Sequence, residues 1–258
     1  MTIYSYEKSG RGKRCSELLE NFPLAREFRT VTVLPIPTTK DGITLGGSGL
    51  PLAALPPLIE KGDLVVGYGV PEGLREELED NGAVVCDALL DEEFLLDNGY
   101  LTALATVGII ITDMKKALND AYIGVVGYGR IGKSLARMLL FLGARVKIYT
   151  SRPETCIELG ESGISSAISE AGADLGELDI LINTAPAVIF DTGTEGGFPE
   201  KLRVIDLASG ENFPGLSSVE RYPSIPAKMF PESAGNIWFR SVKRQLEKRR
   251  KERDGDRR

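Results

Sequence analysis

The chain has 258 residues, of which 42% are hydrophobic and 26% charged, and its formal net charge is −6. These values are typical of a globular protein of one large domain or two small ones, and they exclude a collagen, a coiled coil and a wholly disordered chain. No uninterrupted apolar run approaches the roughly 18 residues that a membrane span needs, and the first residues lack the features of a secretion signal. We therefore expect a cytoplasmic protein with no membrane partner.

The chain contains no histidine. This excludes every mechanism that depends on an imidazole, including Ser-His-Asp hydrolysis, histidine-ligated zinc and the His-Glu pair of many hydroxyacid dehydrogenases. The three cysteines, at 15, 86 and 156, are too widely spaced to indicate a disulfide framework or a metal pair. We therefore predict no metal.

The charge is unevenly distributed. Residues 240–258 carry a local charge of +6, so the first 239 residues carry −12. An acidic body argues against a nucleic-acid partner. The basic tail, residues 248–254, is most simply a solvated helix end that frays into disorder. Nucleic acid or an acidic partner bound to this tail is the alternative.

Residues 1–118 alternate between strand and helix patterns, which predicts an N-terminal α/β domain. We expect strands at 3–6, 31–34, 64–68 and 83–86, and helices at 14–21 and 72–80. Apolar residues recur at helical spacing over residues 100–118, which predicts a long helix that leads out of this domain.

Residues 119–235 predict a second α/β domain of the Rossmann type, with a doubly wound parallel sheet. We expect strands at 123–126, 145–149, 179–183 and 202–206, and helices at 131–142, 154–160 and, weakly, 167–175. A proline-rich loop follows at 214–231. The C-terminal helix begins near residue 233, and residues 236–258 form the C-terminal segment with the basic tail.

A Gly-x-Gly-x-x-Gly motif, Gly127–Gly132, lies between a predicted buried strand and an amphipathic helix. This context is the one that a dinucleotide-binding turn requires. Gly127 permits the tight turn, Gly129 lets a pyrophosphate approach the backbone, and Gly132 allows close packing of the helix. A tight turn without a ligand is the alternative interpretation.

The end of the second strand of this domain distinguishes NAD from NADP. An acidic residue there would bind a free ribose 2′-hydroxyl. Here the chain has Thr150, Ser151 and Arg152, with no carboxylate before Glu154. A hydroxyl and a guanidinium bind a 2′-phosphate, so we favour NADP, with NAD as the alternative. An exposed loop charge is the other interpretation of Arg152.

Two further turns, residues 183–186 and 206–209, follow predicted strands and should lie at the same edge of the sheet as the glycine motif. Ligands bind at this edge in open α/β sheets, although both segments also suit plain turns. The predicted cofactor-binding residues are Gly127, Tyr128, Gly129, Arg130, Ile131, Gly132, Thr150, Ser151, Arg152, Asn183, Thr184, Ala185 and Pro186.

Several motifs together resemble the dipicolinate synthase A family. They are residues 127–132, 142–146, 183–186 and 205–209, the segment 223–228, and the Pro-x-Ser-Ala-Gly of 231–235. The resemblance extends over about residues 120–240. The Asp-Leu-Ala-Ser and Pro-x-Ser-Ala-Gly motifs are much more specific to this family than the glycine motif.

The resemblance implies an NADP-dependent oxidoreductase that oxidises a dihydrodipicolinate-type heterocycle to pyridine-2,6-dicarboxylate. It also implies a role in sporulation beside a flavoprotein-like second subunit, and we expect a homo-oligomer. Aromatisation of the ring would drive hydride transfer to the nicotinamide. The catalytic candidates are Asp206, as proton acceptor, Lys228 and Ser209. The candidates for substrate binding are Arg11, Lys13, Arg14, Ser233 and Ala234, with the cations placed to hold two carboxylates. A helix or turn cap is the other interpretation of Asp206.

The N-terminal half departs from the family pattern. Residues 7–14 replace the Gly-Gly-Asp-x-Arg turn of the family, and Thr102–Ala105 replaces its Thr-Ala-Glu-Gly element, with the acid lost. Two alternative functions therefore stay open. One is a Rossmann reductase or dehydrogenase of another imine or keto acid, and the other is a nucleotide-binding regulatory subunit without catalysis.

Overall fold

The computed structural model describes residues 1–46, 48–169, 175–187, 198–213 and 218–255. It divides into two compact units, Met1–Asn98 with Pro226–Arg258, and Gly99–Ile225. Each unit contains one parallel β-sheet with helices, which confirms the predicted class of two α/β domains. The limits of the units differ from the predicted divisions after residues 118 and 235, because the first limit falls inside the long helix Glu92–Asp113 and the C-terminal helix belongs to the first unit.

The first unit is built on a four-stranded sheet with the order β1-β2-β3-β4, in which every pair is parallel. Val31, Val33 and residues 64–66 are almost completely buried in its core. The strands are β1 (Thr2–Ser5), β2 (Thr30–Val33), β3 (Leu64–Gly67) and β4 (Val84–Asp87). The helices that connect them are α1 (Gly10–Glu20) and α2 (Glu72–Asp80), with short 3-10 turns at Ala25–Glu27, Leu52–Ala54 and Pro56–Leu58, and a further turn at Ala88–Leu90 follows β4.

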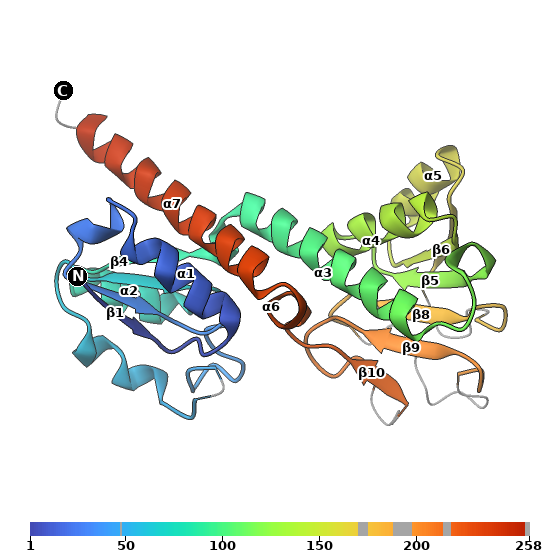
Figure 1. The fold of residues 1–258 in the computed structure, drawn as a ribbon, viewed down its shortest axis with the longest axis horizontal. Coiled ribbons are helices and arrows are strands. Elements are labelled where there is room, and N and C mark those ends of the chain that lie inside the picture. Colours follow the sequence, from blue (N-terminus) through green and yellow to red (C-terminus); the bar gives the residue numbers. More distant parts are fainter. Residues whose placement is uncertain (47, 170–174, 188–197, 214–217, 256–258) are drawn as a thin grey trace. The chain divides into compact units, whose positions relative to one another are not determined.

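The long C-terminal helix α7 (Pro231–Gly255) lies beside α1 in this unit (Figure 1). A Cβ atom added to Gly235 would lie 2.5 Å from Cβ of Arg14, so the glycine permits the close approach of the two helices. The Arg14 Nε also donates a hydrogen bond of 2.9 Å to Asn236 Oδ1. Residues 248–254 continue the helix, so the predicted fraying of this segment is wrong.

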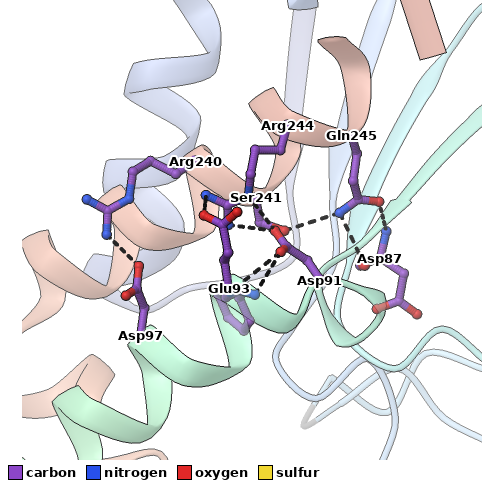
Figure 2. A network of polar contacts seen from close by, with 9 residues as sticks. Asp87, Asp91, Glu93, Asp97, Arg240, Ser241, Arg244 and Gln245 are labelled. Atoms are coloured by element: carbon purple, nitrogen blue, oxygen red, sulfur yellow. Dashed lines mark hydrogen bonds and ion pairs between the residues drawn. The ribbon is translucent and has the colours of Figure 1, made fainter. Parts of the chain in front are cut away.

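Polar contacts from α7 anchor it to β4 and to the start of helix α3 (Glu92–Asp113) (Figure 2). Gln245 accepts a hydrogen bond from the Asp87 amide and donates one to the Asp87 carbonyl. Arg244 donates to Asp91 at 2.7 Å, and Asp91 accepts from the Phe94 amide in the first turn of α3. These contacts explain why α3 begins at residue 92 rather than at the predicted residue 100.

Replacement of Arg244 with methionine is expected to lower the free energy of unfolding by about 1–2 kcal/mol, because Asp91 would lose its guanidinium partner. Burial raises the pKa of Asp91, but hydrogen bonds from Ser241 and Arg244 and the positive charge of Arg244 outweigh it, so the pKa lies below its ordinary value. The stabilisation of the folded state by this ion pair is therefore complete above the ordinary pKa of Asp91. It is lost as the pH falls through the lower pKa that Asp91 has in the folded protein.

Urea unfolding of the two proteins at several pH values measures this effect, and the difference between them should shrink in acid. Arg250→Met is the matched control, because Arg250 and its partner Asp254 are both exposed and lie 3.9 Å apart. An equal loss of stability in both variants would contradict the stabilising role given to the Arg244–Asp91 pair.

The second unit is built on a six-stranded parallel sheet with the order β10-β9-β8-β5-β6-β7. This is the doubly wound Rossmann order, with its switch point between β5 and β8. The strands are β5 (Tyr122–Val126), β6 (Arg145–Thr150), β7 (Ser165–Ile168), β8 (Ile180–Asn183), β9 (Arg203–Asp206) and β10 (Val219–Arg221). The helical segments are α4 (Arg130–Phe141), α5 (Pro153–Glu161) and a short turn at Leu118–Asp120.

Two predictions for residues 165–231 are wrong. Residues 165–168 form the edge strand β7 where a weak helix was predicted from 167, and residues 170–174 lie outside the described residues. Strand β10 and the short helix α6 (Ile225–Met229) occur within the predicted proline-rich loop. Short, partly exposed segments of this kind are stabilised mainly by their neighbours in the fold.

Helix α3 continues into the second unit, where Ala103, Val107 and Ile110 pack into the core around β5 and α4. Among the described helices it is the one long and apolar enough to cross a membrane by length and composition, and 44% of the qualifying window is buried. A core helix has this composition as well, and the burial of its inner face agrees with that role.

Candidate functional site

The glycine motif forms the turn between β5 and α4. Gly127 has a φ of +88°, a left-handed conformation that favours glycine, and an added Cβ would lie 2.8 Å from the Thr184 hydroxyl. Thr184 Oγ1 donates a hydrogen bond of 2.8 Å to the Val126 carbonyl, which ties β8 to the start of the turn. A Cβ added to Gly132 would collide with the carbonyl oxygen of Gly127. These two glycines are therefore required by the fold itself.

Gly129 differs from its two neighbours in the motif. It precedes α4 with φ −82° and ψ −161°, an extended conformation that any residue can adopt. A Cβ added there would meet no protein atom within 4 Å. Nothing in the described fold requires a glycine at this position, whereas a ligand that approaches the backbone would require one.

A cavity of about 270 Å³ opens in front of this turn at the carboxyl ends of β5, β6 and β8. Its lining contains the predicted residues Gly127, Tyr128, Gly129, Thr150, Ser151, Arg152, Thr184, Ala185 and Pro186. It also contains Tyr149 and Thr155, which were not predicted. Four predicted residues, Arg130, Ile131, Gly132 and Asn183, do not line it. Thr155 lies at the start of α5, beside the turn. The sequence does not show this proximity, so sequence reasoning could not have identified Thr155.

One end of this cavity has a cationic and hydroxyl-rich lining. Ser151 and Arg152 are exposed between β6 and α5, and the Arg152 amide donates to the Thr150 hydroxyl at 3.2 Å. Among the described residues that line the cavity, none carries a carboxylate. The glycine motif leads directly into α4, and a helix N-terminus favours an anion. The lining therefore suits an anionic group such as a phosphate.

The buried carboxylate of Asp206, at the end of β9, is surrounded by hydrogen-bond donors. It is 2% exposed and accepts from Asn183 Nδ2 at 2.9 Å, from the Ala208 amide at 3.2 Å and from Asn212 Nδ2 at 3.2 Å. Asn212, a buried residue that the sequence analysis missed, also donates to the Ser209 carbonyl. These contacts give Asp206 the role of a turn cap, and its role as proton acceptor stays a prediction.

The other predicted catalytic and substrate-binding residues lie in different environments. Ser209, Lys228, Ser233 and Lys13 are exposed, whereas Ala234 is buried within α7. Arg11 is 4% exposed and lies 3.5 Å from Glu7 in an ion pair, and Arg14 contacts Asn236. The two arginines are therefore largely used in packing within the first unit. Among the described residues, no group of three or more Cys, Asp or Glu side chains is placed to hold a metal ion.

Comparison with known proteins places this fold among dehydrogenases and their relatives. No family model matches the chain. A curated relative, dipicolinate synthase A of Bacillus subtilis (strain 168), is 25% identical over 154 residues, which are 57% of this chain and 52% of the relative. The match thus spans about half the length of that relative.

Solved structures extend the likeness over nearly the whole chain. Dipicolinate synthase A from Bacillus halodurans superimposes with a TM-score of 0.72 at 18% identity, covering 95% of this chain and 97% of the other. D-lactate dehydrogenase from Salmonella superimposes with a TM-score of 0.55 at 13% identity, covering 95% and 96%. The predicted resemblance to dipicolinate synthase A is confirmed by both comparisons, and the more distant structures show a shared fold.

Proposed function

We propose that this chain is a nicotinamide-dependent oxidoreductase that uses NADP and oxidises a dihydrodipicolinate-type heterocycle to pyridine-2,6-dicarboxylate. The observation that supports this proposal most directly is Gly129, a glycine that the fold does not need. It lines an open cavity at the switch point of a Rossmann sheet. A pyrophosphate lying against the backbone is the physical reason for a glycine there. The likeness to dipicolinate synthase A supports the substrate class.

The choice of NADP depends on the residues that follow β6. Ser151 and Arg152 occupy the position at which NAD-binding proteins of this fold carry a carboxylate. A guanidinium and a hydroxyl donate hydrogen bonds to a phosphate, whereas a carboxylate would repel it. Thr155, the third residue of α5, adds a further hydroxyl to the cavity lining beside Ser151 and Arg152.

A bound nicotinamide would accept a hydride from a ring carbon of the substrate, and a proton would leave as the ring becomes aromatic. The protein has to hold the substrate carboxylates and orient the reacting C–H bond. Water can accept the proton, so the chemistry does not require an imidazole. Asp206 and its donors Asn183 and Asn212 would keep the turn after β9 in place at the same sheet edge.

The absence of histidine excludes only the imidazole-dependent form of the keto-acid alternative, and a reductase of another imine or keto acid that uses Lys228 or a tyrosine as its acid stays open. A dehydrogenase that protonates a carbonyl oxygen through an imidazole cannot operate in this chain. A regulatory subunit that binds a nucleotide without catalysis would retain the same cavity, so only an activity assay separates it from the enzyme.

The test is to incubate the full chain with NADP and freshly formed dihydrodipicolinate, and to follow reduced nicotinamide by absorbance and pyridine-2,6-dicarboxylate by chromatography. Both products should appear in equal amounts. The assay is repeated with a flavoprotein-like second subunit, because we propose that such a partner assists the reaction. NADP binding without product in either assay would favour the regulatory alternative.

A further inference from the structure

Gly99 is a buried glycine in the interior of a helix. It is the eighth residue of α3 and lies in the part of this helix that belongs to the second unit. Glycine is less favourable than alanine in a helix interior, because it loses more backbone freedom on folding. The surroundings of Gly99 supply a reason for the missing side chain.

The neighbour of Gly99 is the first turn of α4, directly after the middle glycine of the motif. A Cβ atom added to Gly99 would lie 3.3 Å from Cβ of Arg130, 3.4 Å from the Arg130 carbonyl carbon and 3.5 Å from the Ile131 amide nitrogen. The first of these distances is shorter than the best separation of two carbon atoms in contact. The backbone of α3 therefore lies against the residues that begin α4, and a side chain at position 99 would press on them.

The residues on this face of α3 increase in size away from the contact. Gly99 is followed at helical spacing by Ala103, Val107 and Ile110, which belong to the core cluster around β5 and α4. The distance between two packed helices depends on the side chains at their contact. This order of sizes therefore suits a closest approach of α3 at the start of α4, where the glycine motif ends.

The contact from α3 acts on a different part of the turn from the contacts described above. Thr184 ties β8 to the start of the turn, and Gly132 packs against the carbonyl of Gly127. Gly99 instead lies against the two residues that follow Gly129. In a Rossmann fold the pyrophosphate lies at this helix N-terminus, so a displacement of these residues would disturb the groups that bind it.

We infer that Gly99 is a positioning residue for the dinucleotide site. Its missing side chain lets α3 support the first turn of α4 in the place that the pyrophosphate requires. Gly99 is not part of the cavity lining, so it acts through Arg130 and Ile131 and does not touch the ligand. The inference rests on the proposed function, because that function supplies the dinucleotide at this turn.

The experiment is calorimetric titration of the full chain and of Gly99→Ala with NADP and with NAD, together with urea unfolding of both proteins. The added methyl group should displace the start of α4 by a few tenths of an ångström and weaken NADP binding by about three- to tenfold. NAD binding should weaken by the same factor, because the two cofactors share the pyrophosphate. The free energy of unfolding should not fall in proportion, since alanine favours a helix.

Gly160→Ala is the matched control for this variant. Gly160 lies on α5 of the same unit, and a Cβ added there meets no protein atom within 4 Å. The control gains the same helix preference without a new contact, so its affinity for both cofactors should equal that of the wild type.

A double-mutant cycle with Arg130→Gly separates the positioning role from a general effect on the fold. Arg130→Gly removes the atom closest to the new methyl group, so Gly99→Ala should cost less cofactor affinity in that background than in the wild type. Unchanged cofactor affinity in Gly99→Ala, an equal loss in Gly160→Ala, or the same loss in both backgrounds would overturn the inference. Cofactor binding that does not depend on Gly99 would refute this role alone, whereas a wild type that binds neither cofactor would refute the proposed function and this role with it.

Discussion

Replacement of Gly129 with valine is expected to abolish dinucleotide binding, with a loss of at least about a hundredfold in affinity, while the second unit stays folded. The extended backbone at Gly129 suits a β-branched residue, and the new side chain would meet no protein atom close to its Cβ. It would instead occupy the space in which the pyrophosphate has to approach the backbone. Titration with NADP and a thermal melt measure the two effects separately.

Gly160→Val is the matched control for this variant. Gly160 lies on α5 in the same unit, and a Cβ added there also meets nothing within 4 Å. This control should bind NADP as the wild type does. Unchanged NADP affinity in Gly129→Val would contradict the assignment of the cofactor site, and so would an equal loss in the control.

Replacement of Arg152 with alanine is expected to weaken NADP binding by about tenfold to a hundredfold and to leave NAD binding almost unchanged. The variant would lose a charge-assisted hydrogen bond to the 2′-phosphate, worth roughly 1.5–3 kcal/mol, which NAD cannot form. Arg152 is exposed and follows directly after β6, so its removal should not disturb the fold. Parallel titrations with the two cofactors measure the selectivity.

Arg137→Ala controls for the general loss of a positive charge, because Arg137 is an exposed residue of α4 outside the cavity lining. The ratio of NADP affinity to NAD affinity in Arg137→Ala should equal that of the wild type. Equal losses for NAD and NADP in Arg152→Ala would show that Arg152 does not discriminate between them. Tighter binding of NAD than of NADP by the wild type would overturn the choice of cofactor.

The strands of both sheets were largely predictable, because buried parallel strands are short apolar runs bounded by turn residues. Residues 64–68 and 123–126, for example, correspond to β3 and β5 within one residue at each end. The edge strand β7 was missed because its two end residues are exposed and its two middle residues only partly buried, with little apolar character. Its hydrogen bonds to β6 define it, and such pairing cannot be read from a segment of four residues.

The start of α3 shows how distant residues decide a boundary. Asp91 followed by the acidic first turn is a local helix-start pattern, but the apolar periodicity used for the prediction begins only near residue 100. Asp91 accepts a hydrogen bond from the Phe94 amide and is held by Arg244, 153 residues away in the sequence. In the same way, Gly235 in the Pro-x-Ser-Ala-Gly motif has a packing role against α1, which became apparent only from the fold.

By itself, the sequence determined the α/β class, the Rossmann turn and the resemblance to dipicolinate synthase A, because these depend on periodicity and on residues close together in the chain. Only the tertiary structure decided which polar groups are available to a ligand. Asp206 and Arg11 are typical functional residues in the sequence, yet Asn183 and Asn212 surround the first, and Glu7 pairs with the second. A buried charge needs partners, and folding brings those partners from other segments of the chain.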